Sequence, residues 1–319
     1  MSYSSIIPVL NGREFVGRAI ESVIGQSLPA GEIIVVDDGS TDGTPQYIRK
    51  NFQTVRVITH PTNLGLSAAR NTAIRCAHFP YLMFLDSDDT WFPDKAKCQM
   101  NAFSQAPSVS AIFTDFRTVD QAGASVGWQG GILAQLQNWK ILGQFVGNDF
   151  YLLTSRLCAS LMEKMSFVHP STVCIKKQAF DTVGLFDETY RTTEDLEMWI
   201  RISHSLQFGF LSTNLSTIES REGSLGAKRV AVTRNIIRLY SSLKTDYPDE
   251  WIGVQRVVRQ ILRDRNAYLA ELLWDQNDRR SAISALLKSL SFGPSRRNLS
   301  DVLGILRGGR SINRKVKEK

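Results

Sequence analysis

The sequence predicts an α/β protein, with a mostly parallel sheet flanked by helices and a smaller helical appendage at its C-terminal end. Strand-like apolar runs alternate with helix-like stretches four times between residues 3 and 85, and such alternation favours parallel strands joined by right-handed crossovers. Apolar residues follow one another in these runs, as in strands covered on both faces. After residue 221 the pattern changes to long amphipathic helices. We therefore predict a first domain over residues 1–221 and a helical C-terminal region over 222–319.

Each element of the first domain is predicted from its apolar spacing and from the turn residues around it. The predicted strands are residues 3–9, 32–36, 55–58, 81–85, 111–119 and 172–175, and the predicted helices are 15–24, 44–51, 66–77, 94–104 and one that starts at 193. Ser40, Thr41 or Asp42 can cap the second helix, and Thr193 the last. Residues 124–168 follow no clear pattern, and we expect an irregular lid or acceptor loop there.

The C-terminal region carries most of the positive charge. Apolar spacing predicts helices around 236–243, 254–275 and 282–290, followed by a mobile basic tail over 307–319. The net charge is +7, with 21 Lys/Arg and 10 Asp/Glu from Ser220 onward, against 17 and 21 before it. A basic region favours anionic partners such as lipid head groups, nucleic acid or an acidic protein, and it is equally compatible with a merely solvated surface.

Composition excludes several classes of protein. The hydrophobic fraction of 43% suits a globular core. The four cysteines form no C-x-x-C and the four histidines no H-E-x-x-H, so neither a disulfide framework nor a zinc site is indicated. No apolar run approaches the ~20 residues that span a bilayer. The first strand starts almost at Met1, so no signal peptide is expected, and we expect a cytoplasmic protein.

The strongest chemical signal is the stretch Phe84–Asp89, in which an apolar strand ends in three carboxylates among four residues. Like charges this close repel one another, and partial burial adds to the cost. The cluster is therefore either a fully solvated turn or the binding site of a cation and a phosphate. Asp86 and Asp88, spaced D-x-D at the carboxyl end of a strand, suit Mg²⁺ or Mn²⁺, which takes one or two carboxylates and completes its shell with substrate phosphates and water.

Two further acidic pairs can share one site with this cluster. Asp37 and Asp38 follow the second strand, and ligands of parallel sheets gather outside the carboxyl ends of the strands. There the two carboxylates can accept hydrogen bonds from a nucleotide base or ribose. Glu194 and Asp195 begin a later helix, where a carboxylate can remove a proton from an incoming hydroxyl or simply complement the helix dipole. Arg70 can donate to a base or phosphate, or pair with one of the aspartates at the carboxyl ends of the strands.

Six segments, in this order and spacing, resemble the family 2 glycosyltransferases of the GT-A fold over about two thirds of the chain. They are Ser5–Gly12, Ile34–Thr44, Asn63–Asn71, Phe84–Asp89, Gly184–Asp187 and Glu194–Arg201. The resemblance implies a GT-A fold, a nucleotide-diphosphate sugar donor, Mn²⁺ or Mg²⁺ as the cofactor, and inverting transfer to an acceptor hydroxyl by direct displacement. A UDP-linked donor is expected, because the family uses such donors most.

The resemblance also implies roles for individual residues. Asp195 is the expected general base, with Glu194 supporting it, and Asp86 and Asp88 are the expected metal ligands. Such enzymes often place a basic or histidine-containing segment after the base helix, and here the candidate is Arg221. The residues expected at the donor are Pro8, Val9, Asn11, Asp37, Asp38, Arg70, Asp86, Ser87 and Arg221.

Two other classes of function share these features. A nucleotidyltransferase or another metal-nucleotide enzyme would use the same rim, although Asn11-Gly12-Arg13 is no glycine-rich phosphate loop. A non-catalytic nucleotide-sugar-binding scaffold would depend on the basic tail. For the leading hypothesis, the expected acceptor is a saccharide, lipid-linked or protein acceptor in polysaccharide or glycoconjugate biosynthesis, and no nucleic acid partner is expected. The basic tail allows peripheral docking at the inner face of a membrane.

Overall fold

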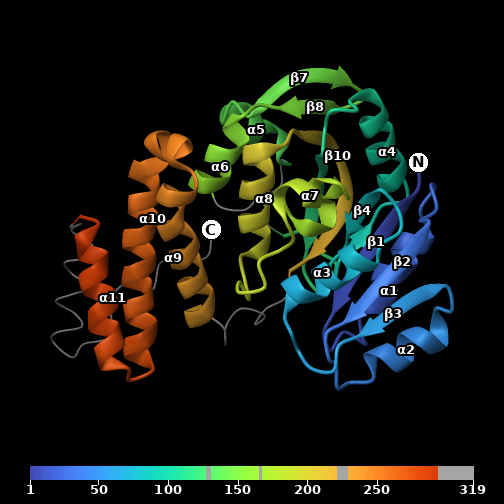
Figure 1. Ribbon diagram of the computed structural model, residues 1–319. Coiled ribbons are helices and arrows are strands. Elements are labelled where there is room, and N and C mark those ends of the chain that lie inside the picture. The colour runs from blue at the N-terminus through green and yellow to red at the C-terminus, as the bar shows by residue number, and fades with distance from the viewer. Residues whose placement is uncertain (127–130, 165–166, 221–228, 294–319) are drawn as a thin grey trace. The chain divides into compact units, whose positions relative to one another are not determined.

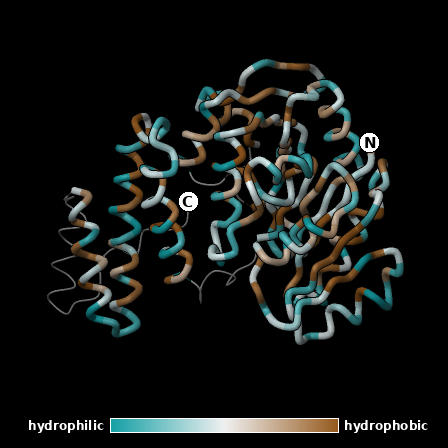
Figure 2. The backbone as a smooth tube through the Cα atoms, viewed as in Figure 1, coloured by the Kyte–Doolittle hydropathy of each residue, from teal (hydrophilic) through white to brown (hydrophobic). Residues whose placement is uncertain are grey.

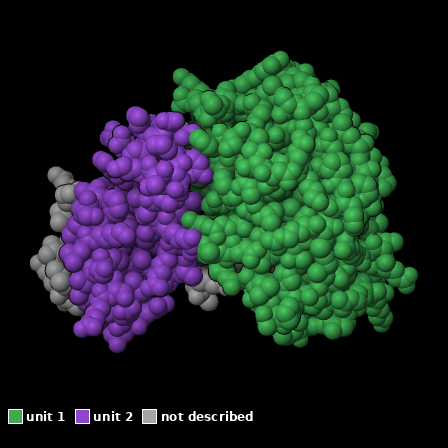
Figure 3. All heavy atoms as spheres, viewed as in Figure 1, with its two compact units in different colours: residues 1–222 green, residues 223–319 purple. Residues whose placement is uncertain are grey.

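In the computed structural model, the chain divides into two compact units, residues 1–222 and 223–319 (Figure 3). The first unit contains a mixed, mostly parallel sheet with helices on both faces, and the described part of the second unit is helical (Figure 1). The fold class predicted from the sequence is confirmed. The structure describes residues 1–126, 131–164, 167–220 and 229–293.

The first unit is organised around one ten-stranded sheet. The strands are β1 (Tyr3–Val9), β2 (Glu32–Asp37), β3 (Val55–Thr59), β4 (Tyr81–Phe84), β5 (Thr90–Trp91), β6 (Ala111–Val119), β7 (Leu142–Gly147), β8 (Phe150–Leu153), β9 (Cys174–Lys176) and β10 (Phe208–Glu219). Their order is β3-β2-β1-β4-β9-β6-β10-β8-β7, and β5 pairs with β10. Strands β1 to β4 are parallel, as the alternating sequence predicts, whereas β9 is antiparallel to both neighbours. The carboxyl ends of β1, β2 and β4 therefore meet at one edge.

Helices cover both faces of this sheet. They are α1 (Val16–Ile24), α2 (Thr44–Asn51), α3 (Leu66–Cys76), α4 (Lys95–Gln105), α5 (Leu133–Asn138), α6 (Arg156–Lys164), α7 (Ala179–Val183) and α8 (Glu194–Ser205). Apolar side chains of α1, α2 and α4 form a core cluster with one face of β1 to β4. On the other face Phe84 packs against Phe180 and Phe186, and Phe186 packs against Trp199 of α8. The brown segments along the strands in Figure 2 fit burial from both sides.

The structure departs from the sequence-based expectation mainly after residue 119. The stretch 124–168 contains α5, β7, β8 and α6, and β7 and β8 extend the edge of the sheet, so the expectation of an irregular loop is wrong for its described part. The predicted strand 172–175 is divided between a 3-10 turn at Pro170–Thr172 and β9. Thr193 precedes α8 with φ of +66° and does not cap it with its side chain.

The second unit contains three helices in its described part: α9 (Arg229–Asp246), α10 (Pro248–Asp275) and α11 (Arg279–Ser291). Buried apolar residues such as Leu243, Val258 and Leu286 recur along each helix at helical spacing. The basic tail over 307–319 lies outside the described residues. Among the helices that the structure describes, none is long and apolar enough to cross a membrane.

Candidate active site

Hydrogen bonds tie together the two loops that follow β1 and β2. The Asp38 N–H donates to the Val9 carbonyl oxygen at 2.8 Å, and the Asn11 N–H donates to Ser40 Oγ at 2.7 Å. Asn11 Oδ1 in turn accepts from the Thr41 N–H at 2.9 Å. Asn11 has φ of +51°, a left-handed conformation that asparagine adopts more readily than most residues. The loops predicted to bind the donor therefore form one framework.

Asp38 is a buried anchor for the loop that precedes α3. Its Oδ1 accepts from the Leu64 N–H at 2.9 Å and lies 2.7 Å from His60 Nδ1, and its Oδ2 accepts from the Gly65 N–H at 2.7 Å. His60 Nε2 lies 2.9 Å from Thr72 Oγ1 on α3. Glycine suits position 65, where φ is +102°. A chain of buried polar contacts thus links the end of β2 to α3, the helix that carries Arg70.

Asp37, the last residue of β2, is less fully engaged. Its Oδ2 accepts a 3.3 Å hydrogen bond from the Ser40 N–H. Its Oδ1 is buried and has no hydrogen-bond partner in the described part of the chain. A buried carboxylate oxygen without a donor is costly. Asp37 Oδ1 can therefore accept a hydrogen bond from a ligand or an ordered water.

Arg70 joins the two ends of the predicted site. Its side chain is 1% exposed, its Nη2 donates to Asp86 Oδ1 and its Nη1 donates to Glu194 Oε1, both at 2.8 Å. Burial lowers the pKa of the guanidinium, but Asp86 and Glu194 raise it by more, so the net shift is upward. One permanent cation thus binds the carboxylate after β4 and the first residue of α8. The predicted convergence of these two acidic sets is present in the structure, and the alternative in which Arg70 pairs with a rim aspartate is present as well.

A second cluster lies beside this bridge. Asp89 is buried; its Oδ2 accepts from the Ser171 hydroxyl at 2.5 Å, and its Oδ1 accepts from the Glu219 N–H at 3.0 Å. His169 Nδ1 lies 3.6 Å from Asp89 Oδ2. Ligand atoms of Asp86, Asp89 and His169 all lie within 4.8 Å of one another. Two carboxylates and an imidazole therefore converge where the sequence predicts a metal.

The family model for glycosyl transferase family 2 matches residues 4–180, more than half of the chain. The chain belongs to glycosyl transferase family 2. The matched segment includes β1 to β4 and the rim aspartates described above, and α8 follows it in the chain. The resemblance inferred from the sequence is confirmed.

Relatives of this family 2 chain are distant. It is 26% identical over 226 residues to an uncharacterized glycosyltransferase of Rickettsia felis, covering 69% of this chain and 35% of that protein. It is 28% identical over 162 residues to a chondroitin synthase of Escherichia coli, covering 48% of this chain and 22% of that one. The chain thus spans about a third or less of the length of these two relatives.

Two solved structures share the fold. The S. aureus TarS 1–349 structure in complex with UDP-GlcNAc has a TM-score of 0.61 and 17% identity, over 97% of this chain and 93% of that one. The mannosyltransferase PcManGT from Pyrobaculum calidifontis, in complex with GDP-Man and Mn²⁺, has a TM-score of 0.57 and 16% identity, over 96% and 79%. At these identities the likeness establishes the GT-A fold alone.

The carboxylate pair at the start of α8 is electrostatically strained in this family 2 chain. Burial and then the neighbouring Glu194 raise the pKa of Asp195 to about 6, against the partial opposition of Arg70, the Leu196 N–H and His169. Asp195 Oδ1 accepts from the Leu196 N–H at 2.7 Å, which orients the carboxylate. A carboxylate with a pKa near 6 is ionised at neutral pH and is a better proton acceptor than an ordinary aspartate.

The donor set at the end of β4 fits a divalent cation. Burial raises the pKa of Asp89 well above its ordinary value, and the charges of Asp86 and Asp88 raise it further. A cation would offset this repulsion, and carboxylate oxygens with an imidazole nitrogen suit Mn²⁺ and, for the oxygens, Mg²⁺. Asp88 and Ser87 lie half-buried in the same turn. Asp86 belongs to the converging set, whereas the assignment of Asp88 as a ligand stays a prediction.

Other predicted residues lie where they can contact a donor or fall outside the described residues. Pro8 and Val9 are buried at the end of β1, on the rim beside Asp38. Arg221 lies outside the described residues, so its predicted role at the diphosphate stays a prediction. Arg191 was not predicted. A Cβ at Gly65 would clash with Arg191 Nη1, so this guanidinium packs against the loop that Asp38 holds.

The sequence-based reasoning also missed Asp89, Ser171 and His169 as members of the site. Asp89 was visible in the acidic run but lacked the D-x-D spacing. Ser171 and His169 belong to no sequence motif. Their partner Asp89 is 82 residues from Ser171 in the chain, so no local spacing links them. Their one local signal is the Pro170 turn before β9, which brings both residues to the rim.

Proposed function

We propose that the chain is an inverting glycosyltransferase that moves a sugar from a UDP-linked donor to an acceptor hydroxyl. The Arg70 bridge carries this proposal, since a fully buried guanidinium 2.8 Å from both Asp86 and Glu194 holds the strand-end carboxylates and α8 around one site. Membership of glycosyl transferase family 2 supports sugar transfer. The TarS complex with UDP-GlcNAc and the chondroitin synthase relative support a uridine diphosphate donor and a polysaccharide or glycoconjugate product.

Asp195 would be the general base in this reaction. As its carboxylate removes the proton from the acceptor hydroxyl, the oxygen attacks the anomeric carbon from the face opposite the diphosphate, and the bond to the diphosphate breaks. A single in-line displacement inverts the anomeric configuration and needs no covalent intermediate. Glu194, fixed by Arg70, would keep the start of α8 in place and maintain the raised pKa of Asp195.

Asp37 and Asp38 would form the nucleoside end of the site, with Pro8, Val9 and Asn11 beside them. The Asp38 carboxylate already accepts hydrogen bonds from the Leu64 and Gly65 N–H groups. Its contribution would be to shape the pocket and to accept one further hydrogen bond at Oδ2. Asp37 Oδ1 retains its full capacity to accept a hydrogen bond.

A divalent cation would bind Asp86, with Asp88, Asp89 or His169 completing the protein ligands. Bound there, Mn²⁺ or Mg²⁺ would neutralise charge on the departing diphosphate. The PcManGT complex with Mn²⁺ supports this assignment. We expect Asp88→Ala to abolish metal-dependent transfer while leaving the fold intact; full activity in that variant would exclude Asp88 as a ligand.

The proposal is tested by a thermal-shift screen of nucleotide sugars with and without Mn²⁺, followed by transfer assays on Asp195→Asn. We expect one nucleotide sugar to raise the melting temperature of both proteins and the variant to lose transfer. Stabilisation by nucleoside triphosphates instead would favour a nucleotidyltransferase. If the wild type binds the donor but neither hydrolyses it nor transfers the sugar, a non-catalytic scaffold is favoured.

The acceptor would be a saccharide, a lipid-linked sugar or a protein. If the basic tail holds the enzyme at the membrane that carries a lipid-linked acceptor, removing residues 307–319 should weaken its sedimentation with liposomes, at roughly 1 kcal/mol for each engaged basic residue. Unchanged sedimentation of the truncated protein would exclude the tail from this role.

A further inference from the structure

Helix α10 of the second unit forms one wall of a hollow outside the candidate active site. The cavity volume is about 550 Å³, and its lining is Ile252, Gly253, Gln255, Arg256, Arg259, Gln260, Arg263 and Phe292. Positions 252, 256, 259 and 263 recur at helical spacing, so these side chains share one face of α10. At 1.5 Å per residue the face is about 17 Å long. Three guanidinium groups are therefore aligned within one face, which we call the arginine face (Ile252, Arg256, Arg259 and Arg263).

The described residues neutralise the positive charge of the arginine face only in part. Arg263 pairs with the adjacent Asp264 at 3.1 Å. Arg256 and Arg259 are exposed and make no ion pair with any residue that the structure describes. The chain after Gly293 adds eight Lys/Arg and only two Asp/Glu, so its composition supplies no acidic block for them. Two unpaired arginines side by side repel each other and favour an anionic ligand.

The same face carries apolar surface beside the charge. Ile252 is 74% exposed and lies one turn before Arg256. Phe292, just after α11, also contributes to the hollow, and Gln255 and Gln260 offer amide donors. A soluble phosphate would satisfy the arginines and leave Ile252 in water. A lipid surface satisfies both, because guanidinium groups bind head-group phosphates while an apolar side chain enters the boundary below them.

We propose that the arginine face of α10 binds the phosphate head groups of an anionic phospholipid bilayer. Arg256 and Arg259 bind the phosphates, and Ile252 enters the interface. The site belongs to the described part of the second unit and is distinct from the basic tail over 307–319. It does not depend on sugar transfer, so its test needs no activity measurement.

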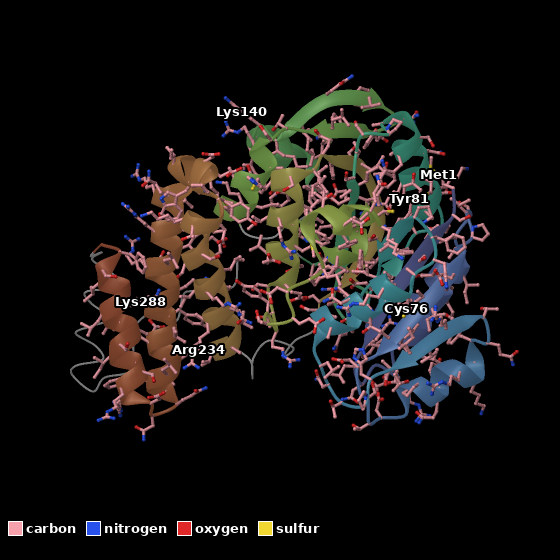
Figure 4. All side chains as sticks on the ribbon, viewed as in Figure 1. Met1, Cys76, Tyr81, Lys140, Arg234 and Lys288 are labelled. Atoms are coloured by element: carbon pink, nitrogen blue, oxygen red, sulfur yellow. The ribbon has the colours of Figure 1, made fainter. Side chains whose placement is uncertain are left out.

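The test measures partition of the full chain onto phosphatidylglycerol-containing vesicles and onto pure phosphatidylcholine vesicles. The variant is Arg256→Gln with Arg259→Gln. At about 1 kcal/mol per engaged arginine, we expect about 30-fold weaker partition onto the anionic vesicles. The matched control is Arg280→Gln with Lys288→Gln, which removes the same charge from α11, where Figure 4 labels Lys288. We expect the control to lose much less affinity.

Three results would overturn the proposal. Equal losses in both double variants would mean that binding follows the overall charge of the region and not the arginine face. Absence of binding by the wild-type chain to anionic vesicles would exclude a bilayer. Tight binding of inorganic polyphosphate through Arg256 and Arg259, with no binding to vesicles, would identify a soluble polyanion as the ligand. An Ile252→Asp variant adds a specific check, because a bilayer penalises a charge at that position and a soluble phosphate does so much less.

Discussion

Replacing the proposed base by its amide should abolish transfer and make the protein more stable at neutral pH. Burial and Glu194 raise the pKa of Asp195 from the ordinary 3.8 to about 6. The folded state therefore holds the Asp195 proton more tightly than the unfolded state does. In the wild type, the stabilisation from this tighter proton binding is fully present below about pH 4 and is lost as the pH rises through about 6. Asparagine carries no charge at any pH and avoids this loss.

The size of the gain follows from the pKa values. A pKa about 2 units above the ordinary value corresponds to about 3 kcal/mol at 1.36 kcal/mol per unit. The first turn of α8 favours negative charge by about 0.3–1 kcal/mol, and the amide forgoes that benefit. Asn Oδ1 can still accept from the Leu196 N–H, as Asp195 Oδ1 does at 2.7 Å. We therefore expect Asp195→Asn to raise the free energy of unfolding by about 2 kcal/mol at neutral pH.

Urea unfolding of the wild type and of Asp195→Asn, at neutral pH and near pH 4, tests this expectation. The gain should be present at neutral pH and become small near pH 4, where Asp195 is protonated in the folded state and only partly ionised in the unfolded state. The matched control is Glu197→Gln, two residues further along the same helix, because Glu197 pairs with Arg201 at 2.6 Å and its loss should destabilise slightly. If Asp195→Asn is less stable than the wild type by the same amount at both pH values, the carboxylate is not strained and the raised pKa is wrong.

Three other predictions test the site and the fold of the first unit. Arg70→Met should lower the free energy of unfolding by about 3–5 kcal/mol, because it leaves two carboxylates without their shared buried cation; urea unfolding measures this, and a loss below about 1 kcal/mol would mean that the bridge is weak. Gly131→Ala should destabilise the fold more than Gly123→Ala, because both glycines have positive φ but only at position 131 would the added Cβ clash with a carboxylate oxygen, Asp115 Oδ2; equal thermal shifts would contradict this. Transfer by the wild type should fall as the pH drops below about 6, where Asp195 gains its proton, and a flat pH profile of kcat/KM would exclude it as the base.

The parts of the fold that the sequence predicted are those with local signals. Strands β2 and β4 are apolar runs that lead directly into aspartates, and burial on both faces accounts for that pattern. Strand β10 was not predicted, because Ser212–Asn214 interrupt its apolar pattern. Its pairing with β6 shifts register between Leu211 and Asn214, so these polar residues occupy an irregularity that only the long-range pairing explains.

The same distinction holds for the candidate site. Asp86 and Glu194 were predicted because strand ends and helix starts are visible in the sequence, and topology brings such positions to one rim. The geometry that joins them was not visible, because it depends on Arg70, which is 16 residues from Asp86 and 124 from Glu194. His169 could not be found from spacing, since its position depends on how β9 inserts between β4 and β6.

The carboxylates around Arg70 outnumber the positive charges that the described residues place beside them. One buried guanidinium serves both Asp86 and Glu194. Asp195 and Asp89 remain with raised pKa values, each because burial adds to the repulsion of a neighbouring carboxylate. Replacing a buried charge by a neutral group of the same shape is often stabilising. A natural protein that keeps such a charge therefore usually needs it for function. Different ligands are expected to relieve the charge repulsion at these two carboxylates. We expect a divalent cation at Asp89 and the proton of an acceptor hydroxyl at Asp195. This surplus of negative charge on both sides of Arg70 supports the cation binding and the proton transfer that we propose for the site.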